Sequence, residues 1–191
     1  DVAAFAHNTG KVFAADNVQA VATDVNAADF ADKLQGFDAV VSAFNPGWSN
    51  PNIGADFAKG AAAITEAAKA AAVPYLLVVG GAGSLYVAPG VQLIDTPEFP
   101  QEIFAGANAA RHLLTDLRDR RDVNWAFISP PAMFYEGSPF EPKGKYRFGQ
   151  DDVLMSGDAP AGIHVDDLAK AIADDAEQKA HLFQRFTVAE V

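Results

Sequence analysis

Short apolar stretches alternate with helical stretches along this chain, and the alternation restricts its fold more than any other feature. Strand-like runs lie at residues 2–6, 18–23, 37–44, 75–79, 125–129 and 183–191. Helix-like stretches lie at residues 29–34, 53–72, 103–117 and 165–177. Such an order is typical of a parallel sheet whose connecting helices cover both of its faces. We therefore predict an α/β protein with a doubly wound, mainly parallel sheet.

Three stretches give more detailed expectations. The run at residues 75–79 is aliphatic, continuous and bounded by proline and glycine, as expected of a central strand buried on both faces. Residues 37–44 predict a second buried strand, which an Asn-Pro-Gly turn ends. Residues 135–148 contain turn residues and the basic stretch 143–147, for which we expect an exposed hairpin.

The length of 191 residues and the apolar share of 50% suit a single domain over residues 1–191. A net charge of -11 makes nucleic acid and anionic membranes poor partners, so we expect a small-molecule ligand. The chain has no cysteine, and no apolar run approaches the roughly 20 residues of a membrane-spanning helix. These features favour a cytoplasmic protein, either a monomer or a homodimer.

Metal binding has little support in the sequence. His112 and His181 lie in helical or near-helical stretches without other ligands at suitable spacing. We predict that both are surface residues and that the chain has no metal site.

Sheets of this kind that bind nucleotides ordinarily begin with a strand, a Gly-rich turn and a helix whose amides hold a pyrophosphate. No such segment precedes Val2, and the usual strand order would then leave a gap in the centre of the sheet. We expect a further strand, turn and helix of roughly 20 to 25 residues upstream of residue 1. Alternatively, residues 2–6 are themselves the first strand, and Asn8, Thr9 and Gly10 form an ordinary turn.

Several segments resemble the NADH-flavin reductase group of atypical short-chain dehydrogenases, which is similar to the smaller biliverdin and flavin reductases and to NmrA-like proteins. They are LLVVGGAGSLYVAPG at residues 76–90, IDTPEFP at 94–100, FDAVVSAFNPG at 37–47, FISPPAMF at 127–134, GKYRFG at 144–149, IHVDDLAKAI at 163–172 and QRFTV at 184–188. The resemblance covers nearly the whole chain. It implies a Rossmann-like, NAD(P)-binding oxidoreductase with a small substrate-side region around residues 133–165.

The resemblance also assigns an adenosine side to the cofactor site. His7 stands where the group commonly has an arginine that meets the ribose phosphate of NADPH, which leaves NADP and NAD both open as cofactors. Asp24 and Val25 match the position that meets the adenine. For His7 the alternative is an ordinary exposed loop residue, and for Asp24 a turn-forming residue.

Three short segments match the positions that meet the ribose, the pyrophosphate and the nicotinamide in the group. The first segment, Ser42, Ala43 and Phe44, would lie below the adenosine ribose and the pyrophosphate. The other two would lie on the two sides of the nicotinamide, and they are Gly80, Gly81 and Ala82 and then Pro130, Pro131 and Ala132. Small residues let a flat ring approach the backbone. The alternatives are a plain core strand at residues 42–44 and a turn with positive φ at residues 80–81.

The expected proton donor of this superfamily is absent. Short-chain dehydrogenases use a tyrosine as the acid, with a lysine four residues further on that lowers the pKa of the tyrosine, and this chain has no such pair. Ser84 and Tyr86 are the only hydroxyls close to the expected nicotinamide position and are the catalytic candidates, the alternative being a structural role in the loop. Hydride transfer to a flavin needs mainly stacking and orientation, so the missing pair favours a flavin, a quinone or another conjugated acceptor.

Six aromatic residues on the expected ligand side are candidates for a stacking surface: Phe44, Trp48, Tyr86, Phe99, Phe134 and Tyr135. The sequence predicts an NAD(P)H-dependent reductase that transfers hydride to a flavin (FMN or FAD) or a similar acceptor. The alternative is a non-catalytic NAD(P)-sensing regulator of the NmrA type. A carbonyl reductase or an epimerase is disfavoured because the tyrosine and lysine are absent.

Overall fold

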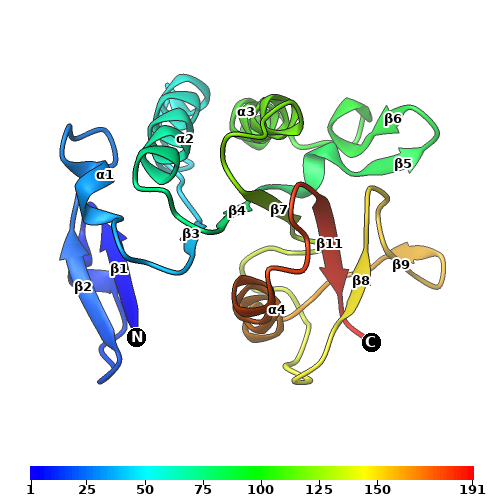
Figure 1. Cartoon of the computed structure of the whole chain (residues 1–191). Helices are drawn as coiled ribbons and strands as arrows, with labels where there is room; N and C mark the ends of the chain where they lie inside the picture. Colours follow the sequence, from blue (N-terminus) through cyan, green and yellow to red (C-terminus); the bar gives the residue numbers. More distant parts are fainter.

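The main sheet of the computed structural model, which describes all 191 residues, has five strands in the order β3-β4-β7-β11-β8 (Figure 1). Their bounds are β3 (Val40–Ser42), β4 (Leu76–Val79), β7 (Trp125–Ser129), β11 (Arg185–Ala189) and β8 (Arg147–Gly149). The first four run parallel, and β8 pairs antiparallel with β11. This arrangement confirms the predicted α/β class with a mainly parallel sheet.

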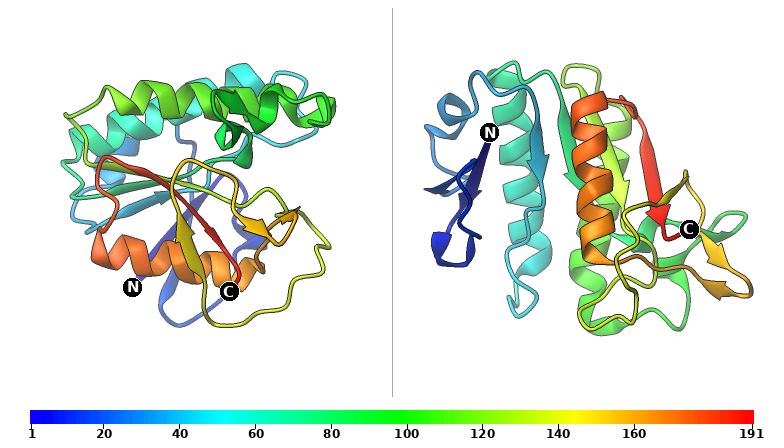
Figure 2. Two further views of the ribbon diagram at one scale, coloured as in Figure 1. Left: turned by 90° about the vertical axis from the view of Figure 1, so that its right-hand side faces the viewer. Right: turned by 90° about the horizontal axis from the view of Figure 1, so that it is seen from below.

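Helices cover the main sheet from both sides, as the two views in Figure 2 show. The long helices α2 (Ile53–Ala70) and α3 (Gln101–Arg118) lie on one face, and α4 (Val165–Gln178) lies on the other. Side chains of β4 and β7 alternate between the two cores. Leu76 and Phe127 belong to the core under α2 and α3, whereas Leu77 and Ile128 belong to the core under α4. The predicted central strand is therefore buried on both faces.

A separate parallel pair forms from β1 (Val2–Ala6) and β2 (Val18–Ala22), and no strand pairing joins it to β3. The pair packs through Phe5 against the core that α2 and α3 share, and the short helix α1 (Phe30–Lys33) contacts α2. Because β3 is an edge of the five-stranded sheet, its Val41 is 44% exposed. The prediction of a buried strand over residues 37–44 is therefore wrong, since only three of these residues form a strand.

Short elements fill the connections between the main strands. They are the 3-10 helices η1 (Thr9–Lys11), η2 (Ala82–Ser84) and η3 (Leu93–Asp95), the hairpin of β5 (Tyr86–Ala88) and β6 (Val91–Gln92), and the hairpin of β9 (Met155–Ser156) and β10 (Ala159–Pro160). None of the helices is both long and apolar enough to cross a membrane.

The basic stretch 143–147 does not form the exposed hairpin that its sequence suggests. The Asp167 carboxylate, buried in the first turn of α4, accepts hydrogen bonds from the amides of Lys143 at 2.8 Å and Gly144 at 2.7 Å. The last residue of the stretch, Arg147, begins strand β8, which pairs with β11. Lys143, Gly144 and Lys145 are exposed as expected, but the prediction of a hairpin is wrong, because these contacts with α4 and β11 come from distant parts of the chain.

A buried polar group links β4, α4 and the turn before β11. The Tyr75 hydroxyl donates to Asp175 Oδ2 at 2.7 Å, and Asp175 Oδ1 lies 2.6 Å from His181 Nδ1. The His181 ring stacks on Phe186 at 3.8 Å, so the predicted surface position of His181 is wrong. Burial, together with the hydrogen bond to Asp175, raises the pKa of Tyr75, so its hydroxyl stays protonated and continues to donate.

Replacing Tyr75 tests this group. In Tyr75→Phe the buried Asp175 loses a donor, and we expect the free energy of unfolding to fall by about 1–3 kcal/mol in urea titrations. The matched control is Tyr135→Phe, because Tyr135 is half-exposed, and its effect should stay within about 0.5 kcal/mol. Equal effects of the two variants would contradict a stabilising role for the Tyr75 hydroxyl.

Candidate cofactor site

The carboxyl ends of β3, β4 and β7 lie at one edge of the main sheet because these strands are parallel and in register. Ser42 pairs with Val78, and Val79 pairs with Ile128. The segments that follow them, which contain the predicted cofactor residues 80–82 and 130–132, therefore begin side by side. Ligands of open α/β sheets bind at this edge.

Gly80 and Gly81 differ in what surrounds them. A Cβ on Gly80 would stand 1.9 Å from Cζ of the buried Phe127 ring, so this position requires glycine for packing. A Cβ on Gly81 would meet nothing within 4 Å, and Gly81 has φ −130° and ψ 162°. Neither glycine has positive φ, so the alternative of a turn that needs a left-handed residue is wrong. Gly81 instead leaves open space at the edge of the sheet.

The predicted adenosine-side residues lie together on the β1–β2 pair. The Thr23 amide donates to Ala6 O at 2.9 Å, so the residues that follow, His7 and Asp24, leave the same edge of the pair, and both are exposed. Hydrogen bonds from the Asn26 amide at 2.8 Å and the Asn26 side chain at 3.2 Å lower the pKa of Asp24. Asp24 is thus an exposed carboxylate with free acceptor capacity. Val25 packs partly against the core.

Of the other predicted cofactor residues, Ala43 is exposed and Ala82 is half-buried. The Phe44 ring packs on α2, where a Cβ on Gly60 would stand 2.3 Å from it. Pro130 and Pro131 are buried, whereas Ser42 and Ala132 are half-buried.

The two candidate catalytic hydroxyls have different surroundings. Ser84 is only 3% exposed, and its Oγ lies 3.4 Å from a guanidinium nitrogen of Arg185. Tyr86 is half-buried and lines a cavity of about 710 Å³ between the β5–β6 hairpin and residues 152–160, part of the predicted substrate-side region. Sequence reasoning missed Arg185, because nothing local to the closing strand indicates a buried cation that contacts this loop.

The six aromatic candidates divide into packed and accessible rings. Phe44, Phe99 and Phe134 pack within the protein. Trp48 is 58% exposed and Tyr135 is 51% exposed, and Tyr86 lies on the cavity described above. Only the accessible rings can offer a surface to a ligand.

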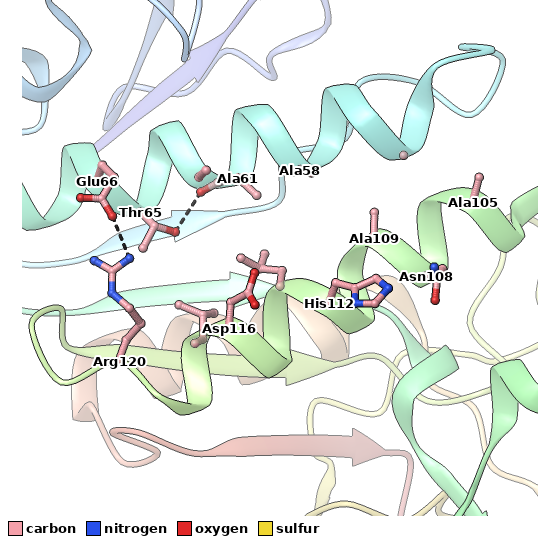
Figure 3. Close-up of a pocket in the computed structure, with 14 residues that line it drawn as sticks. Ala58, Ala61, Thr65, Glu66, Ala105, Asn108, Ala109, His112, Asp116 and Arg120 are labelled. Atoms are coloured by element: carbon pink, nitrogen blue, oxygen red, sulfur yellow. Dashed lines mark hydrogen bonds and ion pairs between the residues drawn. The ribbon is translucent and has the colours of Figure 1, made fainter.

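A second cavity, of about 410 Å³, lies between α2 and α3 (Figure 3). Alanines such as Ala58 and Ala109 line it together with Asn108, His112 and Asp116. It contains none of the predicted site residues, and the two helices place it on one face of the sheet rather than at its edge. No group of three or more His, Asp or Glu side chains in the structure could hold a metal ion.

This arrangement is that of a nucleotide-binding α/β protein, and comparison with known families agrees. The chain belongs to the NAD(P)H-binding family, whose profile matches residues 1–179. The NADH-flavin reductase resemblance of the sequence and the Rossmann-like fold are both consistent with this family.

Three solved structures are similar over nearly the whole chain. One is described as an exported protein of Burkholderia pseudomallei, with 35% identity, TM-score 0.82, and 98% of this chain and 86% of that chain covered. One is provisionally called an epimerase, from Bacteroides thetaiotaomicron, with 31% identity and TM-score 0.84, and the similarity covers 99% of this chain and 85% of that chain. The third is provisionally called an NADH-flavin reductase, from Streptococcus pneumoniae, with 29% identity and TM-score 0.83, and the similarity covers 99% of this chain and 87% of that chain.

Residues at the edge of the main sheet and on the separate β1–β2 pair fit an adenine dinucleotide in three respects. Gly81 leaves open space beside the strand ends, where a flat ring can approach the backbone. The Asp24 carboxylate is exposed and can accept from an exocyclic amine. His7, next to it, offers ring nitrogens that can donate to a ribose hydroxyl or, when protonated, to a phosphate.

The two glycines make a matched pair for testing this edge. We expect Gly80→Ala to lower the free energy of unfolding by roughly 1–3 kcal/mol, because its Cβ overlaps the Phe127 ring. Gly81→Ala should change it by no more than about 0.5 kcal/mol, because the added methyl group meets open space. Urea unfolding of both variants measures the difference, and equal destabilisation would show that residue 81 is not open.

Proposed function

We propose that this protein is an NAD(P)H-dependent reductase that transfers hydride to a flavin or a similar conjugated acceptor. The observation that carries the proposal is the open backbone at Gly81, next to the ends of the two central strands of an NAD(P)H-binding domain. Similarity to a structure provisionally called an NADH-flavin reductase supports the same class of reaction.

The residues of this chain would hold the coenzyme along the sheet edge. His7 and Asp24 would contact the adenosine end, with Val25 beside the adenine, and the backbone of residues 42–44 would lie under the ribose and pyrophosphate. Residues 80–82 and 130–132 would lie on the two sides of the nicotinamide. When bound, the reduced nicotinamide supplies the hydride, and the protein supplies orientation and exclusion of water.

The character of the acceptor follows from the absence of a strong proton donor. Ser84 is buried against Arg185, and Tyr86 is the hydroxyl with access to a cavity. Val153, Met155 and Pro160 give that cavity an apolar side suited to a flat conjugated ring. An acceptor whose reduced form takes its proton from water, such as a flavin or a quinone, needs no further acid from the protein.

Two wider properties belong to the same proposal. We expect the protein to work in the cytoplasm, where reduced nicotinamide is supplied, although one similar structure is described as an exported protein. We expect its partner to be a small molecule, because its net charge of -11 opposes nucleic acid and anionic membranes. It would act as a monomer or a homodimer.

Steady-state turnover tests the reductase directly. With FMN present, we expect the purified protein to oxidise NADPH or NADH continuously, measured as loss of nicotinamide absorbance. Gly81→Ala should fold normally and yet bind the coenzyme several-fold more weakly in calorimetric titrations, because the methyl group occupies the space beside the ring. Tight coenzyme binding without turnover on flavins and quinones would contradict the reductase and favour an NmrA-type sensor.

The choice between the two coenzymes rests on His7. His7→Arg should raise the affinity for NADPH relative to NADH by about tenfold, because a guanidinium pairs permanently and bidentately with a phosphate. Phe13→Arg adds the same charge at a residue that is 85% exposed but lies beyond the end of β1, and it serves as the control. A similar shift in both variants would indicate a general charge effect and not a contact at residue 7.

A further inference from the structure

Arg185, the first residue of β11, has a side chain that is only 1% exposed. Its guanidinium donates hydrogen bonds to three other segments of the chain. The acceptors are Asp151 Oδ1, at 2.8 Å from Nε and 2.5 Å from a terminal nitrogen, Asp151 O at 3.1 Å, Ser129 Oγ at 3.3 Å, and Ser84 Oγ and Ser84 O, both at 3.4 Å. A single buried group therefore contacts β7, the loop after β4 and the segment after β8.

The charge of this group is balanced by Asp151, which also pairs with Arg118 at 2.9 Å. Burial lowers the pKa of Arg185, and the hydrogen bond with Asp151 opposes that shift. Only the arginine of this pair is buried, because the Asp151 side chain is 48% exposed, and ion pairs that reach solvent give little net stability. The planar guanidinium instead fixes the positions of its acceptors, because it can donate to several of them at once only in one relative arrangement.

One of the three segments that Arg185 contacts is the loop of residues 80–86. This loop begins with the glycines at the sheet edge and ends at Tyr86 on the cavity. Arg185 holds the middle of the loop through Ser84 and holds the Asp151 backbone that receives the Tyr86 amide at 2.8 Å. The Val153 amide in turn donates to Tyr86 O at 2.9 Å. The middle of the loop and its C-terminal end at Tyr86 thus both depend on one guanidinium.

We propose that Arg185 is a positioning residue of the candidate reductase site, whose guanidinium holds the loop of residues 80–86 so that Gly81 stays open at the sheet edge and Tyr86 stays on the cavity. The inference rests on the proposed function, because it concerns the same site. Arg185 touches neither coenzyme nor acceptor in this scheme and acts through the loop.

Amide hydrogen exchange on the coenzyme-free protein tests the positioning without any turnover. In Arg185→Lys the charge remains, but a single ammonium nitrogen cannot take the positions of the three guanidinium nitrogens that donate to the three segments. We expect exchange at the amides of Tyr86 and Val153 to accelerate by at least about tenfold, while amides of β4 and β7 keep their protection. In the same variant, kcat with FMN should fall by about tenfold to a hundredfold, because the loop is misplaced.

Arg118→Lys is the matched control. Arg118 shares the Asp151 carboxylate but is 45% exposed and has no hydrogen bond to the loop, so its replacement should leave exchange at Tyr86 and Val153 unchanged. If Arg185→Lys does not fold, Ser84→Ala removes one acceptor of the guanidinium and should accelerate the same amides by a smaller factor of about three.

Three results would overturn the positioning role: unchanged exchange in residues 80–86 of the folded variants, uniform acceleration over the whole sheet, or equal effects of Arg118→Lys. These three results differ from a failure of the proposed function. That failure would be seen in the wild-type protein, as the absence of coenzyme binding or of turnover. The exchange measurement on Arg185→Lys needs neither coenzyme binding nor turnover, so the two proposals can fail separately.

Discussion

Burial of the central parallel strands between helices on both faces is the constraint on which the rest of this structure depends. Every residue of β7 and β11 is buried, and β4 alternates between the core under α2 and α3 and the core under α4. With both faces covered, strand backbone becomes accessible only where the strands end. The candidate residues 80–82 and 130–132 therefore lie at the carboxyl edge, where ligands of open α/β sheets bind.

The loop after β4 shows how close packing and open space are combined within a few residues. Gly80 is pressed against the Phe127 ring, whereas Gly81, the next residue, faces empty space. Ser84 then turns back into the protein to meet Arg185, and Tyr86 returns to the border of a cavity. A loop with such alternating surroundings can be both rigid and accessible, which is what orientation of a flat coenzyme ring requires.

Structures that share this fold over nearly the whole chain carry different descriptions, one as an exported protein, one as an epimerase and one as an NADH-flavin reductase. The fold accordingly sets where a nucleotide binds, and a few side chains set what happens there. In this chain His7 is a candidate for such a side chain, and the tyrosine and lysine pair of the larger dehydrogenases is absent.

The sequence by itself determined the α/β class, the long helices and the buried strands at residues 75–79 and 125–129, because periodicity and bounding prolines and glycines act locally. It also pointed to Gly80 and Gly81, although only the structure separated a packing glycine from an open one. Tertiary structure alone decided that β8 pairs with β11, that the Tyr75 hydroxyl donates to Asp175 and that Arg185 reaches Ser84. The reason is physical: those contacts join residues that are as many as 101 positions apart, where no local pattern specifies the partner.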